Sequence, residues 1–160
     1  MYYRSSIVIY KNIDNIKYYC LGLEPNICML VDFGGHVEPD DNDIYDTAIR
    51  EYKEETSSIF GEITKDILYT SDHVDINSTL TFFVDADRLS NYDMSIYRSI
   101  FRCYPDELKK EIMDLVWFTE PQLYLMLENP DFCLFGHTKL NIFYKPLYNA
   151  LKFYLNTQSI

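Results

Sequence analysis

The sequence has little positive charge and no long apolar run, and each absence argues against a class of protein. Only 14 of the 160 residues are Lys or Arg, against 25 Asp and Glu, which gives a formal net charge of −11. A broad nucleic-acid-binding surface needs a basic patch, so this composition argues against one. No apolar run approaches the roughly 20 residues that a helix needs to cross a bilayer. We therefore expect no membrane-spanning segment.

The four cysteines form no C-x-x-C pair and no Cys/His cluster with the spacing of zinc ligands. Cys20 and Cys28 lie in strand-like runs, and we expect them to be buried thiols. The chain does not begin with a charged segment followed by an apolar one, so no signal peptide is expected. Together these absences predict a reduced cytoplasmic setting, or the host cytoplasm if the protein is viral.

Apolar and aromatic residues are abundant, at 48% and 16% of the chain. This content is typical of a packed globular protein and argues against a disordered chain. The sequence shows no repeat, low-complexity tract or linker. Residues 1–160 are therefore expected to form one domain.

Hydrophobic periodicity predicts strands and helices that alternate along the chain. We expect strands at 2–11, 17–23, 27–33, 36–38, 63–71, 78–85 and 111–118, a loop at 72–77, and helices at 44–56, 93–103, 120–128 and 138–156. Pro146 is expected to kink the last helix or to mark the start of its second half. This order predicts an α/β/α sandwich, in which a mixed β-sheet lies between helix 44–56 and a C-terminal helix.

Residues 87–111 give the weakest pattern in the chain. We interpret them as an insertion in the single domain. Such an insertion acts either as a lid or specificity element, or as an ordinary surface excursion.

Residues 34–57 are the most informative stretch. They begin with Gly34-Gly35 and continue through an Asp-rich loop into an amphipathic helix, for which Asp43 is the predicted N-cap. Apolar residues recur at helical spacing on one side of this helix. The other side carries three carboxylates, those of Glu51, Glu54 and Glu55.

Three carboxylates on one helical stripe repel one another unless a cation lies among them, and hard oxygen ligands suit Mg²⁺ or Mn²⁺. Arg50 can pair with Glu54 at i, i+4 and leave the other carboxylates for the metal. The glycine pair would let the backbone approach a ligand at the helix N-terminus, which favours anions such as phosphate. The alternative is a solvated helix face with the same charges and no metal.

The same residues carry a family resemblance. Gly35 and the run Arg50-Glu51-Tyr52-Lys53-Glu54-Glu55 resemble the Nudix box, G-x5-E-x7-R-E-U-x-E-E-x-G-U, in which U is apolar. The sequence departs from the box where Asp41 replaces Glu, where one extra residue precedes Arg50, and where Ser57-Ser58 replace the closing Gly and apolar residue. The resemblance predicts a Nudix-type α/β/α sandwich.

The resemblance also implies a function, that of a Nudix pyrophosphohydrolase. Such enzymes use Mg²⁺ or Mn²⁺ to hydrolyse a diphosphate linkage in a nucleoside-diphosphate-linked substrate. It implies catalytic roles for Arg50, Glu51 and Glu54, with Glu51 as a third metal ligand or the general base. Glu54 and Glu55 would be the main metal ligands, and Gly35 would offer its backbone carbonyl. Arg50 would orient the glutamates.

Residues outside the helix complete the candidate site. His36 and Glu38 follow the glycine pair and are candidates for substrate binding. In Nudix enzymes a carboxylate outside the box often takes part in catalysis. Asp114, Glu111 and the segment 72–75 are the candidates here, and the sequence does not choose among them.

The box helix is similar to that of mRNA-decapping Nudix enzymes, including those of large DNA viruses. The acidic composition instead favours a small nucleotide whose base stacks on a Tyr or Phe. Capped RNA and diphosphoinositol polyphosphates are the alternative substrates. A Nudix fold that has lost catalysis and binds RNA or a protein is the alternative function, although the intact R-E-x-x-E-E favours an enzyme. The oligomeric state is left open, a homodimer included.

Overall fold

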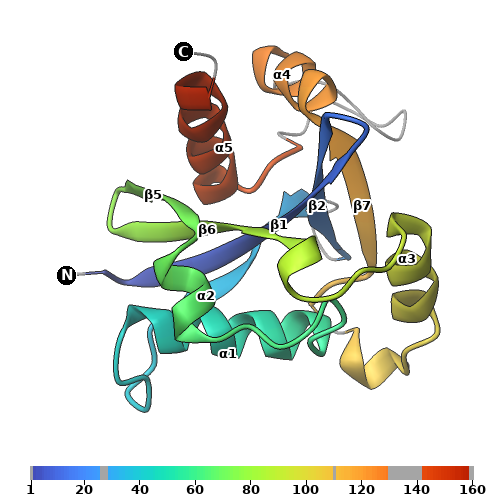
Figure 1. Cartoon of the computed structure of the whole chain (residues 1–160). Coiled ribbons are helices and arrows are strands. Elements are labelled where there is room, and N and C mark those ends of the chain that lie inside the picture. The colour runs from blue at the N-terminus through green and yellow to red at the C-terminus, as the bar shows by residue number, and fades with distance from the viewer. Residues whose placement is uncertain (1, 26–28, 110, 130–141, 159–160) are drawn as a thin grey trace.

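The computed structural model describes residues 2–25, 29–109, 111–129 and 142–158, and Figure 1 shows their arrangement. The strands are β1 (Arg4–Ile13), β2 (Ile16–Glu24), β3 (Met29–Val31), β4 (Phe33–His36), β5 (Asp72–Ile76), β6 (Thr79–Asp85) and β7 (Asp114–Thr119). The helices are α1 (Ile44–Thr56), α2 (Lys65–Tyr69), α3 (Met94–Arg102), α4 (Glu120–Glu128) and α5 (Lys145–Gln158), with short 3-10 turns η1 (Ala86–Arg88) and η2 (Asp106–Leu108).

The strands form one mixed sheet around β1. The order is β3-β2-β1-β6-β5, with β4 also paired to β1 and β7 to β2. Strand β1 runs parallel to β6 and antiparallel to β2 and β4. The predicted mixed sheet is therefore confirmed.

Each face of the sheet is covered by helices and has its own apolar core (Figure 1). On the α1 face, Ala48 and Tyr52 pack with Phe82 of β6. On the α5 face, Leu151 packs with Phe83, the next residue of the same strand. Successive residues of a strand point to opposite faces, so β6 contributes to both cores. The structure is the predicted α/β/α sandwich.

Several predicted elements are confirmed. Helix α1 spans the predicted residues, and the Asp43 side chain accepts hydrogen bonds from the Tyr45 and Asp46 amides, both at 3.0 Å. Helix α4 starts with a capping box at Thr119. Buried Cys20 agrees with the expectation for that thiol, whereas Cys28 lies outside the described residues.

Two predictions between the glycine pair and β6 are wrong. Residues 63–71 contain helix α2 in place of a strand, because a short apolar run does not distinguish the two structures. The predicted loop at 72–77 is edge strand β5, joined to β6 by a turn at Asn77 and Ser78. Both turn residues have positive φ, at 52° and 61°, which closes the hairpin tightly.

Two further boundaries differ from the predictions. The strand predicted at 27–33 is divided at Asp32 into β3 and β4, and its residues 27–28 lie outside the described ranges. The glycine pair lies within β4 rather than in a loop, and β4 ends at His36, so the strand predicted at 36–38 is wrong beyond that residue. The last helix begins at Lys145, so Pro146 occupies its first turn, where its missing N–H costs little, and it causes no kink. Residues 138–141 of the predicted helix lie outside the described residues.

Helix α3 lies within the 87–111 segment and packs against β7. Tyr97 and Phe101 are fully buried in the core on the α1 face. The segment is therefore anchored to the domain by apolar packing. None of the helices in the described ranges is long and apolar enough to cross a bilayer.

Candidate active site

The two glycines of β4 allow close packing on both of their sides. A Cβ added at Gly34 would lie 2.2 Å from the Ser6 Cβ on β1, and one at Gly35 would lie 2.3 Å from a carboxylate oxygen of Glu51. The glycine pair thus brings the Glu51 side chain onto the β4 backbone. Gly35 therefore meets α1 at Glu51, in the middle of the helix, and not at the N-terminus of the helix.

The N-terminal amides of α1 already have an anionic partner in the chain. Asp43 accepts from two of them, and Lys65 donates to the same carboxylate at 2.8 Å. The phosphate expected at this helix end would have to compete with Asp43 for these amides.

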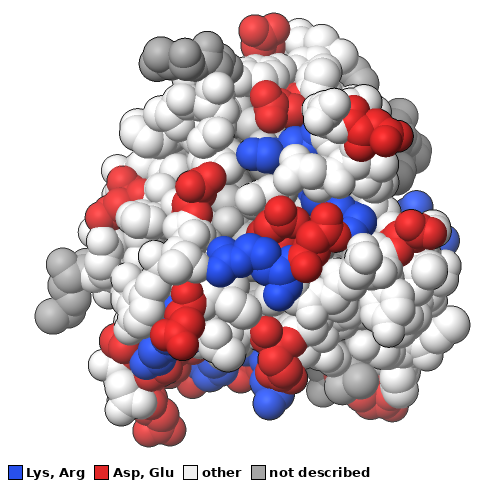
Figure 2. Space-filling model, viewed as in Figure 1, with Lys and Arg blue, Asp and Glu red and all other residues white. Residues whose placement is uncertain are grey.

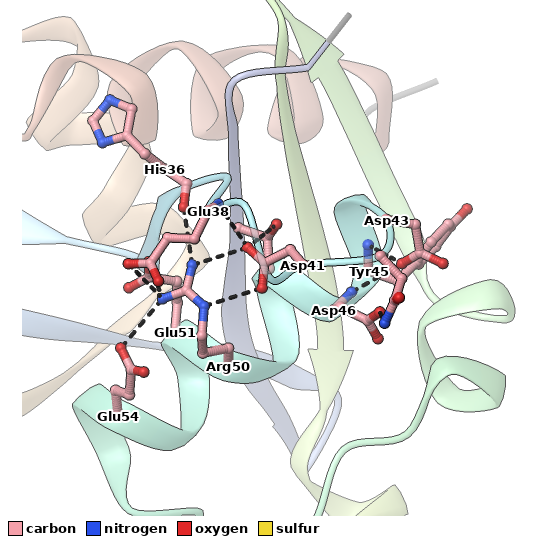
Figure 3. Close-up of polar contacts among 11 residues, drawn as sticks. His36, Glu38, Asp41, Asp43, Tyr45, Asp46, Arg50, Glu51 and Glu54 are labelled. Atoms are coloured by element: carbon pink, nitrogen blue, oxygen red, sulfur yellow. Dashed lines mark hydrogen bonds and ion pairs between the residues drawn. The ribbon is translucent and has the colours of Figure 1, made fainter.

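Arg50 lies at the centre of a polar network on the outer side of α1 (Figure 3). Its guanidinium donates to Glu51 at 2.8 Å, to Glu54 at 3.3 Å and to the His36 carbonyl oxygen at 2.9 Å. Two further bonds, both 3.1 Å, reach the carboxylate of Asp41. The expected pairing of Arg50 with Glu54 is present, together with contacts to the loop before the helix.

Asp41 holds Arg50 in place. It also accepts from the Thr47 hydroxyl at 2.8 Å and from the Glu38 amide at 2.9 Å. The bonds from Arg50 are the main reason why the pKa of Asp41 falls to about 2. Asp41 therefore anchors the Arg50 guanidinium from the loop, although its side chain is shorter than the Glu of the box and the loop has one extra residue.

Glu55 and Glu51 are poorly solvated carboxylates. Burial raises the pKa of Glu55 well above its ordinary value, and the charges of Asp32 and Glu51 raise it further, against one hydrogen bond from the Gly34 amide at 2.8 Å. Burial also raises the pKa of Glu51, although Arg50 opposes the shift. Glu54 is mostly exposed, with 59% of its side-chain surface accessible. The helix thus presents two buried acids and one exposed acid.

A pocket of about 260 Å³ opens beside β4. Four carboxylates line it, from Glu24, Asp32, Glu55 and Glu111. Gly35, His36, Arg4 and Tyr144 also contribute to the lining.

Among the described residues that line the pocket, Arg4 supplies the one guanidinium, and this group is already neutralised. Arg4 is buried and bonds to Asp32 at 2.7 and 3.1 Å and to the Gly34 carbonyl oxygen at 3.0 Å. The pocket therefore carries excess negative charge. Neither member of this pair was predicted from the sequence. The only signal in the sequence is Asp32, which interrupts an apolar run just before the glycines.

The charge of this site suits a divalent cation. Within the described ranges, no three Asp, Glu, His or Cys side chains already converge as a metal site. The donors are nevertheless hard oxygens, and the neighbouring charges of Asp32, Glu51 and Glu111 raise the pKa of Glu55 together. A cation among them would relieve this repulsion, so the residues fit Mg²⁺ or Mn²⁺ by chemistry and charge.

The other predicted residues divide between this pocket and the rest of the surface. His36 and Glu111 line the pocket, whereas Glu38 lies on the Arg50 network, 3.6 Å from the guanidinium. Asp114 forms ion pairs with Arg98 and Arg102 of α3 at 2.7 and 2.6 Å.

The segment 72–75 does not contribute to the pocket lining. It forms edge strand β5, where Asp72 accepts from the Tyr154 hydroxyl at 2.9 Å and Asp75 from the Tyr2 hydroxyl at 2.5 Å. Glu111 is therefore the candidate acid outside the box that the fold brings to the pocket.

The face of the molecule in Figure 2 has no broad basic patch. Lys and Arg side chains lie directly beside Asp and Glu, and large areas between them are uncharged (Figure 2).

No family model and no curated protein sequence matches the chain. Solved structures do match over nearly its whole length. An Ap4A hydrolase of C. elegans in a binary complex has a TM-score of 0.56 at 17% identity and covers 99% of this chain and 98% of its own. A putative NUDIX hydrolase of Listeria monocytogenes also reaches 0.56, at 11% identity, over 99% and 95% of the two chains.

A NUDIX hydrolase of Nitrosomonas europaea gives a TM-score of 0.51 at 18% identity, over 97% of this chain and 89% of its own. Such low identities establish a common fold and leave activity to be tested. The predicted resemblance is confirmed at that level, and this chain has the Nudix fold.

Proposed function

We propose that the protein is a metal-dependent hydrolase that cleaves a phosphoanhydride bond in a small nucleotide. The acidic pocket beside the R-E-x-x-E-E helix is the observation that carries this proposal. The four carboxylates of its lining would repel a phosphate chain, and Arg4 is already paired with Asp32. An anionic substrate can enter such a pocket only with cations that neutralise both sides.

Glu51, Glu54 and Glu55, with the backbone carbonyl of Gly35, would hold the Mg²⁺ or Mn²⁺. The metal would supply charge neutralisation for the phosphoryl oxygens and a lower pKa for a bound water. Glu55 lines the pocket and is fixed by the Gly34 amide, whereas Glu54 is exposed and bonded to Arg50 at 3.3 Å.

The remaining groups position these carboxylates and bind substrate. Arg50 holds Glu51 at 2.8 Å and is itself held by Asp41, which keeps the buried glutamate at the β4 backbone. His36 would contact phosphate from the pocket wall. Glu111 is the preferred general base outside the box, because Asp114 is committed to two arginines.

A small nucleotide fits better than a polymer. The pocket volume of about 260 Å³ lies just below the range of roughly 300–1,000 Å³ typical of ligand pockets. The C. elegans neighbour is named for a nucleotide substrate, Ap4A, which places dinucleoside polyphosphates among the compounds to test. Capped RNA and diphosphoinositol polyphosphates, the alternative substrates given by the sequence, also belong to the compounds to test.

The test is turnover of a substrate panel with Mg²⁺ or Mn²⁺. The panel contains nucleoside triphosphates, Ap4A, ADP-ribose, NADH, coenzyme A, an inositol pyrophosphate and capped RNA. Glu54→Gln removes one proposed ligand, and Lys53→Gln changes the adjacent exposed residue of the same helix as a control. We expect metal-dependent hydrolysis of a nucleotide that is lost in Glu54→Gln and kept in Lys53→Gln.

Two results would contradict the proposal. Equal turnover in both variants would show that the assignment of the metal site to this helix is wrong. No turnover of any compound by the folded protein would favour the alternative of a Nudix fold that only binds RNA or a protein.

A further inference from the structure

We propose that Tyr144 is the base-stacking residue of the pocket and that it selects ligands with an aromatic base, purines above all. The proposal deepens the proposed function and rests on it for the identity of the substrate. The sequence predicts that a base stacks on a Tyr or Phe, but it does not show which of the 15 tyrosines and 10 phenylalanines is the stacking residue. Of these side chains, only that of Tyr144 is among the described residues that line the pocket.

Tyr144 lines the pocket together with Asp32 and Glu55. Among the described lining residues it is the only Phe, Tyr or Trp, and His36 is the only other aromatic ring. The large exposed aromatic side chains among the described residues, those of Tyr3, Tyr69, Tyr92 and Phe153, do not belong to this lining. A base that follows its phosphates into the pocket therefore meets the Tyr144 phenol ring.

The backbone of Tyr144 is held on both sides. Its amide donates to the Leu30 carbonyl oxygen of β3 at 2.9 Å. Its own carbonyl oxygen accepts from the Tyr148 amide in the first turn of α5, at 3.0 Å. Because the chain is fixed between the sheet and a helix, the ring loses little conformational entropy when a ligand stacks on it.

The ring is also supported from one side. The Arg4 guanidinium lies over it, with its central carbon 5.3 Å from the ring centroid. Arg4 cannot move away, because it is buried and bonded to Asp32 and Gly34. A cation over one face of the ring stabilises the position of the ring by a cation–π contact.

The chemistry of the lining fits an amino-bearing base. Val31 and Tyr144 supply the apolar surface on which a flat ring can pack. The carboxylate of Glu111 is a hydrogen-bond acceptor, which matches the exocyclic amino groups of adenine and guanine. Purines expose more stacking surface than pyrimidines, so we expect them to bind better.

The test compares two ligands that differ only in the base. AMP and ribose 5-phosphate are titrated in the presence of Mg²⁺, with NMR or calorimetry as a binding readout that needs no turnover. The variants are Tyr144→Leu, which removes the aromatic ring, and Tyr144→Phe, which keeps it. Tyr92→Leu changes an exposed tyrosine on another part of the surface and is the matched control. Thermal melting of each variant verifies that the fold is kept.

We expect Tyr144→Leu to weaken AMP binding by about 5- to 150-fold, the range that corresponds to one lost base stack. Ribose 5-phosphate should bind all proteins alike, and Tyr144→Phe and Tyr92→Leu should bind AMP as the wild type does. Unchanged AMP affinity in folded Tyr144→Leu, an equal loss for both ligands, or no AMP binding to the wild type would overturn the inference. The titration is independent of hydrolysis, so absent turnover with Tyr144-dependent AMP binding would reject the proposed function alone.

Discussion

Two carboxylates near the same core, Asp114 on β7 and Glu55 on α1, have opposite electrostatic surroundings. Burial alone would raise the pKa of Asp114, but hydrogen bonds from Arg98 and Arg102 outweigh it and lower the pKa to about 2. For Glu55, burial raises the pKa and neighbouring acids raise it further. Asp114 is bonded to two arginines, whereas Glu55 accepts one hydrogen bond from the Gly34 amide and interacts with the charge of Arg4, a guanidinium already bonded to Asp32.

This difference separates a structural acid from a candidate ligand-binding one. The two arginines of α3 tie that helix to the sheet through Asp114. An ionised Glu55 is a charge buried at the edge of a pocket. Burial of this charge costs free energy, which a bound cation would offset. A shifted pKa in a pocket makes a residue a candidate for function, and the pKa of Glu55 is raised by burial and by neighbouring acids at the pocket wall.

The largest effect is expected from Glu55→Gln. Loss of a proposed metal ligand should lower metal-dependent turnover by at least about 100-fold, since even second-layer partners of metal ligands cost 10–100-fold. Removing a poorly solvated charge should leave the melting temperature of the metal-free protein unchanged or higher. A variant that keeps full activity would remove Glu55 from the metal site, and one that fails to fold would give it a structural role like that of Asp114.

Gly35→Ala and Gly34→Ala should separate activity from stability. The new Cβ at position 35 would displace the Glu51 carboxylate, a movable group, so turnover should fall by about 10- to 100-fold with little change in stability. At position 34 the new Cβ would lie 2.4 Å from the Ser5 carbonyl oxygen, and the protein should be destabilised by about 1–3 kcal/mol. Kinetics and denaturant unfolding of both variants test the pair. The same loss of stability in both would contradict this assignment.

Asp114→Asn should affect stability and not chemistry. The amide cannot neutralise Arg98 and Arg102, and we expect a loss of about 1–3 kcal/mol in the free energy of unfolding. Turnover per folded molecule should stay within about twofold of the wild type. Urea unfolding and kinetics on one preparation measure both. A large drop in turnover would make Asp114 the acid outside the box in place of Glu111.

The smallest effect concerns acid stability. Because Asp114 has a folded-state pKa of about 2, below the ordinary 3.8, its ion pairs stabilise the protein above about pH 4. That contribution is lost as the pH falls from about 4 toward 2. With an allowance for solvent screening it should amount to about 1 kcal/mol. Unfolding free energies between pH 5 and 2 should therefore fall less steeply for Asp114→Asn, and parallel curves would show that the pairs contribute nothing.

The sequence predicted the elements whose signals are local. Helix α1 was predicted to its last residue because its N-cap at Asp43, apolar stripe and length all agree. Helix α4 has an equally local signal in its capping box. Strand β5 and helix α2 were misassigned, because short segments take their structure from packing on the sheet.

The sequence predicted the residues of the candidate site that a motif marks, on the helix and at Gly35, His36 and Glu111 outside it. Glu51, Glu54 and Glu55 have a spacing that can be read along the chain. The Arg4–Asp32 pair and Tyr144 reach the pocket from strands and a helix start that are far apart in sequence. No local pattern marks such residues, because only the register of β1, β3 and β4 brings them together.

The most direct test of the central claim is Mn²⁺ binding, measured by electron paramagnetic resonance or calorimetry on three proteins. The account predicts that the wild type and Asp114→Asn bind Mn²⁺ with the same affinity and that Glu55→Gln loses at least about tenfold. Equal binding by all three proteins would contradict it, because Glu55 would then be no metal ligand.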